Sequence, residues 1–161
     1  MNKNMRSFLL PVFVLLLCFS CKSEADKEKL KAELLKIHHD LIRAHLTNDP
    51  SLSVQTILEN FASVKDGEIT FPDRDEVLSG ITDYISNTTF SEYRDLQEPV
   101  FGLSEDGTVG WVIARVSVQG ERKLNDGTTR EISFICSWMT LYRRVNGRWV
   151  TEAEVSTFDP D

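Results

Sequence analysis

Two histidines are the residues of this sequence best suited to chemistry. His38 and His45 lie in a run where apolar residues such as Leu34 and Leu41 recur at helical spacing. At 100° per residue both histidines fall in the apolar sector, whereas His39 points to the polar side. An inward imidazole acts as an acid, a base or a hydrogen-bond donor to a ligand, or it is buried and hydrogen-bonded for structure alone. Both interpretations stay open.

Metal and cofactor sites have little support in the sequence. Residues seven apart on a helix lie about 10.5 Å apart along its axis, too far for a simple two-histidine chelate. No third ligand accompanies His38 and His45. The sequence also lacks a Gly-rich phosphate loop, a Cys-x-x-Cys pair, a His-Glu-x-x-His run and a Gly-x-Ser-x-Gly turn. We therefore expect neither a metal nor a cofactor.

Arg115 is the one charged residue in the apolar, strand-like run 109–118. A guanidinium group there binds the carboxylate or enolate oxygen of a ligand, or it forms an ion pair with an acid on a neighbouring strand. Glu152 and Glu154 are candidate partners, and the ion pair is the favoured interpretation.

Large aromatic residues offer walls for an apolar pocket. Trp111, Trp138 and Tyr84 are candidates for that role, and packing in a core is the alternative for each of them. Cys136 lies in another apolar run and is interpreted as a small buried hydrophobic residue rather than a reactive thiol.

The elements that must position these residues change character near residue 89. Before residue 89 the apolar residues recur at helical spacing. This spacing predicts a long helix over 30–47, a short helix from Asp49-Pro50 to Phe61 and a third helix over 72–86. After residue 89 the pattern alternates, and it predicts strands over 91–103, 108–120, 128–143 and 148–158. Gly-containing turns separate these strands, as in antiparallel hairpins. The fold class predicted is α+β, with helices covering one face of a single antiparallel sheet.

The first 21 residues resemble the signal and lipobox of a bacterial lipoprotein. Lys3 and Arg6 precede an apolar run of about a dozen residues, which is shorter than the roughly 20 that span a bilayer. Ser20 precedes Cys21, the residue that the resemblance marks for lipidation. The implied organisation is a signal peptide over 1–20, a lipidated tether over 21–29 and a folded domain over 30–158. Ordinary secretion is the alternative.

Charge limits the partners of the exported protein. Loss of Lys3 and Arg6 with the signal changes the formal net charge from −7 to −9. Such a surface repels phosphate backbones and anionic lipid headgroups, so we expect no nucleic-acid binding. Attachment to the membrane would then depend on the acyl chains of Cys21. The expected location is the bacterial cell envelope.

The order of elements resembles the NTF2-like superfamily, in particular its SnoaL-like and DUF4440-like branch. The segments that carry the resemblance are 46–49 at the end of the first helix, the turn at 105–107 and the hairpin at 140–149. The resemblance implies a long first helix and two shorter helices on a strongly curved sheet, with a pocket at the open end of the cone. The steroid-isomerase branch places a general-base aspartate before a proline, but Phe71 precedes Pro72 here.

Three functions follow as expectations. The first is an envelope domain that holds a small, largely apolar ligand in the cone. The second is an enzyme of lyase or isomerase type that uses His38 or His45 as acid-base and Arg115 as oxyanion partner. The third is a scaffold that forms a homodimer through the sheet or binds an envelope protein, which exposed apolar residues on the outer face would favour.

Overall fold

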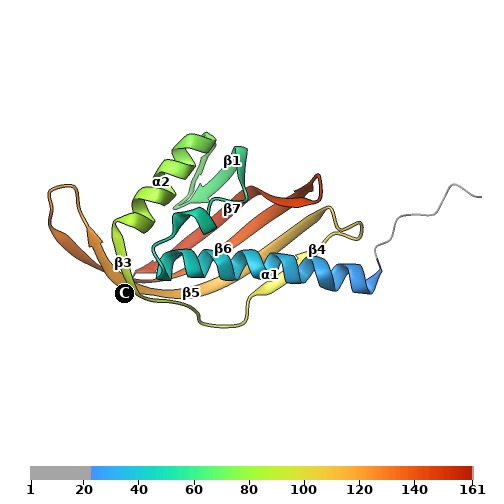
Figure 1. Cartoon of the computed structure of the whole chain (residues 1–161), viewed down its shortest axis with the longest axis horizontal. Helices are drawn as coiled ribbons and strands as arrows, with labels where there is room; N and C mark the ends of the chain where they lie inside the picture. The colour runs from blue at the N-terminus through green and yellow to red at the C-terminus, as the bar shows by residue number, and fades with distance from the viewer. Residues whose placement is uncertain (1–22, 161) are drawn as a thin grey trace, which may run out of the picture.

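The computed structural model describes residues 23–160, and the predicted signal peptide and Cys21 lie outside them. Two α-helices, one 3-10 turn and seven strands form this part of the chain (Figure 1). In chain order they are α1 (Glu24–Leu46), the 3-10 turn η1 (Pro50–Leu52), β1 (Ile57–Lys65), β2 (Glu68–Thr70), α2 (Arg74–Ser86), β3 (Thr88–Asp95), β4 (Val100–Leu103), β5 (Val109–Lys123), β6 (Thr129–Val145) and β7 (Arg148–Pro160). The predicted α+β class is confirmed.

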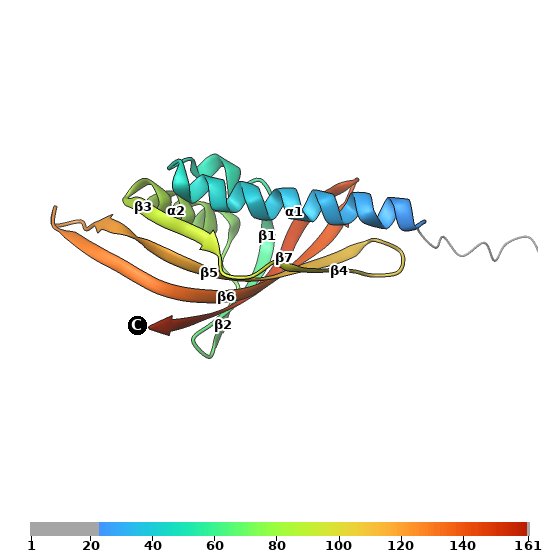
Figure 2. The ribbon, with the colours of Figure 1, turned by 90° about the horizontal axis from the view of Figure 1, so that it is seen from below.

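All seven strands belong to one sheet. Its order is β2-β1-β7-β6-β5-β3, and β4 pairs with the other half of the β5 edge. The sheet was expected to be antiparallel throughout, which is wrong at one place, because β1 runs parallel to β7. Both helices lie on one face of the twisted sheet (Figure 2). That inner face carries the core.

Helix α1 begins six residues earlier than predicted. The side chain of Ser23 accepts a hydrogen bond from the backbone N–H of Asp26, and this cap starts the helix within the segment expected to be a tether. Leu30, Leu34 and Ala44 on its inner face are buried. Helix and sheet approach closely at Gly110 of β5, where an added Cβ would lie 2.8 Å from Leu34 Cδ1.

The predicted second helix is wrong. Asp49 does cap a turn, but that turn has only three residues and strand β1 follows. Ile57 and Phe61 are buried, and β1 pairs with both β2 and β7. A short apolar run is compatible with both the helical and the alternating spacing of apolar residues. Here the pairing with β7 makes this run a strand.

The third predicted helix is confirmed as α2. Asp73 and Glu76 form a capping box at its start. The strand expected over 91–103 is split into β3 and β4, which pair with different halves of β5. The β5 and β6 strands are long and pair without a shift from Val109↔Arg143 to Lys123↔Thr129.

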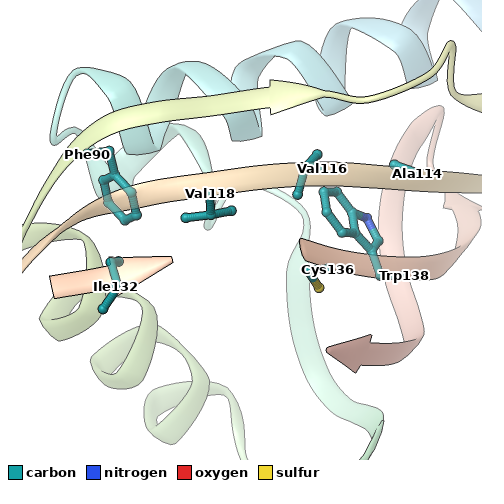
Figure 3. Close-up of a cluster of buried hydrophobic side chains, with 7 residues drawn as sticks. All are labelled: Phe90, Ala114, Val116, Val118, Ile132, Cys136 and Trp138. Carbon is teal, nitrogen blue, oxygen red and sulfur yellow. The ribbon is translucent and has the colours of Figure 1, made fainter. Parts of the chain in front are cut away.

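The core divides into two clusters along α1. The filled end consists of residues packed under the first half of the helix: Leu30, Leu34, Val112, Tyr142 and Trp149. The hollow end consists of residues near α2 and the far ends of β5 and β6: Phe90, Ala114, Val116, Val118, Ile132, Cys136 and Trp138 (Figure 3). The hollow end borders a cavity.

Candidate functional site

A cavity of about 650 Å³ lies between the helices, β1 and the inner face of the sheet. This volume lies within the range of small-molecule sites. Its apolar walls come from α1, η1, β1, α2, β6 and β7, and they include Ile37, Leu41, Leu52, Ile57, Ile81, Ile132, Phe134, Trp138 and Phe158. Polar and charged residues make up about half of the lining, and they define the chemistry of the site.

Glu154 enters the cavity because of a bulge in β7. Tyr142 pairs with Thr151 and Leu141 pairs with Ala153, so Glu152 is an extra residue in the ladder. The extra residue puts Thr151 and Glu154 on the same inner face, and both line the cavity. Strict alternation would have placed them on opposite faces.

The carboxylate of Glu154 has few partners. Thr140 of β6 donates one long hydrogen bond of 3.4 Å to it. No basic side chain of residues 23–159 forms an ion pair with it, although Lys65 on β1 is near enough to lower its pKa. Burial outweighs both effects and raises the pKa of Glu154 above its ordinary value.

His45 also lines the cavity, and its tautomer is fixed. Nδ1 lies 2.7 Å from the carbonyl oxygen of Leu41, so Nδ1–H donates and Nε2 keeps a lone pair. Tyr93 stacks on the ring at 4.2 Å between centroids, and the edge of Phe90 meets it at 5.0 Å. Burial lowers the pKa of His45. At neutral pH the imidazole is therefore an acceptor.

His38 serves a different purpose. Its Nε2–H donates to Asp95 of β3 at 2.9 Å, and its ring lies 5.9 Å from that of Trp138. The residue is 3 % exposed and lies outside the cavity lining. Burial lowers its pKa, against the opposing effect of Asp95. The arrangement ties α1 to β3, as the structural interpretation of a buried histidine expects.

Arg115 and Trp111 point away from the cavity. Both lie on the outer face of β5, and Arg115 is exposed. Within the described part of the chain, Arg115 has no ion pair with Glu152 or Glu154, and Glu152 pairs instead with Arg143. Trp111 covers Gly102 of β4, where an added Cβ would lie 1.9 Å from its ring.

Trp138, Tyr84 and Cys136 do line the cavity. The guanidinium of Arg122 lies 5.2 Å from the ring of Tyr84, and burial raises the pKa of that phenol to about 12. Cys136 is buried, and burial raises the pKa of its thiol to about 11. A thiol with that pKa is unreactive at neutral pH, in accord with its interpretation as a hydrophobic residue.

Sequence reasoning therefore missed Glu154 as a cavity residue. It considered Glu154 only as a partner for Arg115, because the bulge that turns the side chain inward leaves no mark in the sequence. No sequence signal distinguished Glu154, because the same strand also contains Arg148 and Glu152. The hydroxyl groups of Tyr142 and Thr140, which also line the cavity, were not singled out either.

Two further searches of residues 23–160 gave negative results. No group of three or more His, Cys, Asp or Glu residues in this range is arranged to hold a metal ion. No helix in the same range is both long and apolar enough to cross a membrane.

Comparison with known proteins identifies the architecture. Neither a protein-family model nor a curated protein sequence matches the chain. An NTF2-like protein from Cytophaga hutchinsonii superposes with a TM-score of 0.60 over 84 % of this chain and 98 % of its own, at 11 % identity. The fold is NTF2-like.

Two other NTF2-like neighbours have names that mention chemistry. A ketosteroid isomerase-like protein from Erwinia carotovora atroseptica has a TM-score of 0.60, 13 % identity and coverage of 86 % of this chain and all of its own. A type 2 hexachlorocyclohexane dehydrochlorinase has a TM-score of 0.66, 12 % identity and coverage of 86 % and 90 %. At these identities the likeness concerns the fold alone.

Proposed function

We propose that this protein is a lipid-anchored domain of the bacterial envelope that binds a small, largely apolar ligand in its cone. The observation that carries the proposal is the cavity of about 650 Å³, in which aliphatic and aromatic residues make up about half of the lining. The signal-like start and Cys21 support the location.

Ligand binding is preferred to the lyase or isomerase alternative because the proposed catalytic residues do not meet. Of His38, His45 and Arg115, only His45 lines the cavity. His38 is occupied by Asp95, and Arg115 is exposed on the other side of the sheet. An enzyme would have to use His45 with groups other than the predicted oxyanion partner.

Blocking the cavity tests the binding proposal. Ser156 lines the cavity from β7, whereas the next residue, Thr157, is exposed on the outer face. Ser156→Trp should abolish the fluorescence increase of the neutral probe N-phenyl-1-naphthylamine, and the matched control Thr157→Trp should keep it. Equal binding by both variants would reject the cavity as the binding site.

Fractionation tests the anchor. Cys21→Ala should move the protein from the membrane fraction to the soluble envelope fraction, because the acyl chains are the proposed attachment. Cys18→Ala is the control and should leave the protein in the membrane fraction. Membrane association of Cys21→Ala would contradict lipidation at this residue.

A specific observation also favours a homodimer formed through the sheet. Val100, Ile113, Met139 and Val155 pair in one row across β4, β5, β6 and β7 on the outer face. They are 52 %, 40 %, 38 % and 39 % exposed. Such an apolar row on a face that neither α1 nor α2 covers suits self-association.

Light scattering of the detergent-purified protein tests the homodimer. Ile113→Glu should give a monomer, because it puts a charge in the middle of the apolar row. The control Gln119→Glu changes an exposed residue on the same strand and face, outside the row, and should stay dimeric. A dimeric Ile113→Glu variant, or a monomeric unmodified chain, would reject this interface.

A further inference from the structure

Among the described residues, the carboxylate of Glu154 has no counter-charge in contact. Glu154 lines the cavity, and the hydrogen bond that it accepts from Thr140 is long. The nearest cationic influence is Lys65, whose ammonium lies 4.6 Å from the centroid of the Phe158 ring instead of within ion-pair distance of the carboxylate. Glu154 is half-buried, and a carboxylate partly withdrawn from water with one weak partner is costly, so a ligand that supplies a positive donor reduces that cost.

The surrounding side chains suit a cation with an apolar body. Trp138, Tyr93 and Phe134 offer aromatic rings in the lining, and aromatic rings attract ammonium groups through their faces. Nε2 of His45 adds a neutral acceptor at another point of the wall. Ser53 adds a buried hydroxyl oxygen that has no hydrogen-bond partner within the described residues. Glu154 and Nε2 of His45 only accept hydrogen bonds, whereas the hydroxyl of Ser53 can accept or donate one.

The mouth of the cavity differs from its interior. Arg122, Arg130 and Glu131 lie near the turn between β5 and β6, and Arg122 forms an ion pair of 2.9 Å with Asp83. These residues are solvated, and their charges are screened by water. The carboxylate of Glu154 interacts with a charged ligand in a lower dielectric than the residues at the mouth do. It therefore has the stronger influence on which ligand charge the cavity accepts.

We propose that the ligand is a hydrophobic amine whose protonated nitrogen pairs with Glu154, while its apolar body fills the aromatic and aliphatic walls. This inference rests on the proposed function, since it names the ligand class of the same cavity. Glu154 is then the residue that determines specificity.

Three probes of one shape test the proposal by isothermal titration at pH 7. Tryptamine, tryptophol and indole-3-acetate share an indole ring and carry a cation, a neutral hydroxyl group and an anion. We expect the cavity to bind tryptamine about tenfold or more tighter than tryptophol, and to bind indole-3-acetate most weakly.

Matched variants assign the preference to one carboxylate. Glu154→Gln keeps the size of the side chain and its acceptor for Thr140 but removes the charge, so tryptamine and tryptophol should bind about equally. Glu152→Gln, two residues along the same strand and outside the cavity lining, should keep the preference, as should Glu131→Gln at the mouth.

The outcomes separate this inference from the binding proposal. If tryptophol binds and tryptamine binds no more tightly, or if Glu154→Gln keeps the preference for the amine, the inference is wrong. The proposed binding of an apolar ligand in the cavity then remains supported. A preference for indole-3-acetate would overturn it in favour of the basic mouth. If none of the three probes binds, both the inference and the proposed binding function fail.

Discussion

The two ends of the cone use the same helix and the same sheet in opposite ways. At the filled end, Leu30 and Leu34 are at most 2 % exposed and pack on Val112 and Trp149. At the hollow end, two turns further along α1, Leu41 and His45 face a cavity. The filled end provides stability and leaves the hollow end free to carry polar groups that a close-packed core would exclude.

The largest expected effect comes from truncating a leucine at the filled end. Leu34→Ala leaves a new cavity in a close-packed cluster and should cost about 3 kcal/mol of unfolding free energy. Leu41→Ala only enlarges a cavity that exists already, so it should cost about 1 kcal/mol. Urea unfolding measures both, and equal losses would contradict the distinction between the two ends.

Overpacking the filled end should be the next largest effect. The Cβ of Gly110→Ala would lie 2.8 Å from Leu34 Cδ1 and 3.2 Å from the ring of Trp149, a clash that should cost about 2 kcal/mol. Combined with Leu34→Ala, the same methyl group enters vacated space, so the double variant should lose less than the sum of the single losses. Additive losses in urea unfolding would mean that the two sites do not touch.

Acid should weaken the protein through its buried histidines. Burial holds the pKa values of His38 and His45 below 6.5, so the unfolded chain takes up protons first as the pH falls. The contribution of these histidines to stability should therefore be fully present above pH 6.5 and should be lost as the pH falls below it. His45→Gln should flatten the decline between pH 7 and 5, whereas the exposed control His39→Gln should leave it unchanged. Thermal unfolding across this range measures the slope.

Glu154 should have the opposite pH dependence. Its pKa is raised in the folded state, so the folded protein holds a proton that the unfolded chain has lost, and the contribution of Glu154 to stability falls as the pH rises above 4.5. Glu154→Gln should therefore melt above the unmodified protein at pH 7 and close to it at pH 4, with Glu152→Gln as the control. A less stable Glu154→Gln variant at pH 7 would show that the carboxylate stabilises the fold.

The smallest expected effect lies on α2, beside the hollow end. Gly80 is inside the helix, and an added Cβ would meet nothing within 4 Å. Gly80→Ala should therefore stabilise the protein by about 0.5–1 kcal/mol through helix propensity. Unchanged or reduced stability would indicate that this face of α2 packs against something absent from the single chain.

Much of the fold could be predicted because its elements are long or carry clear turn signals. The apolar stripe of α1 and the Asn-Gly and Asp-Gly turns around β6 gave the right elements and order. The errors fall where local signals are weak. The run from Val54 to Phe61 is short enough to suit a helix or a strand, and Ser23 capped a helix whose first residues looked like a solvated tether.

The candidate site was less predictable than the fold. His45, Trp138 and Tyr84 were chosen from the sequence and line the cavity, whereas His38, Arg115 and Trp111 do not. Periodicity places a residue on a face, but it does not say whether that face meets core, cavity or solvent. His38 and His45 share a face of one helix and differ only in their surroundings. His38 donates a hydrogen bond to Asp95 of β3, whereas His45 faces the cavity.

The sequence by itself determined the α+β class, the long first helix and the hairpin turns, because these depend on neighbours along the chain. The export signal stays a prediction, because its residues lie outside the described range. Only the tertiary structure decided where the cavity lies and which polar groups face it. The decisive features are the parallel pairing of β1 with β7 and the bulge at Glu152. Both arise from contacts between distant segments, and a shift of one residue in a strand moves a carboxylate such as Glu154 from solvent into the pocket.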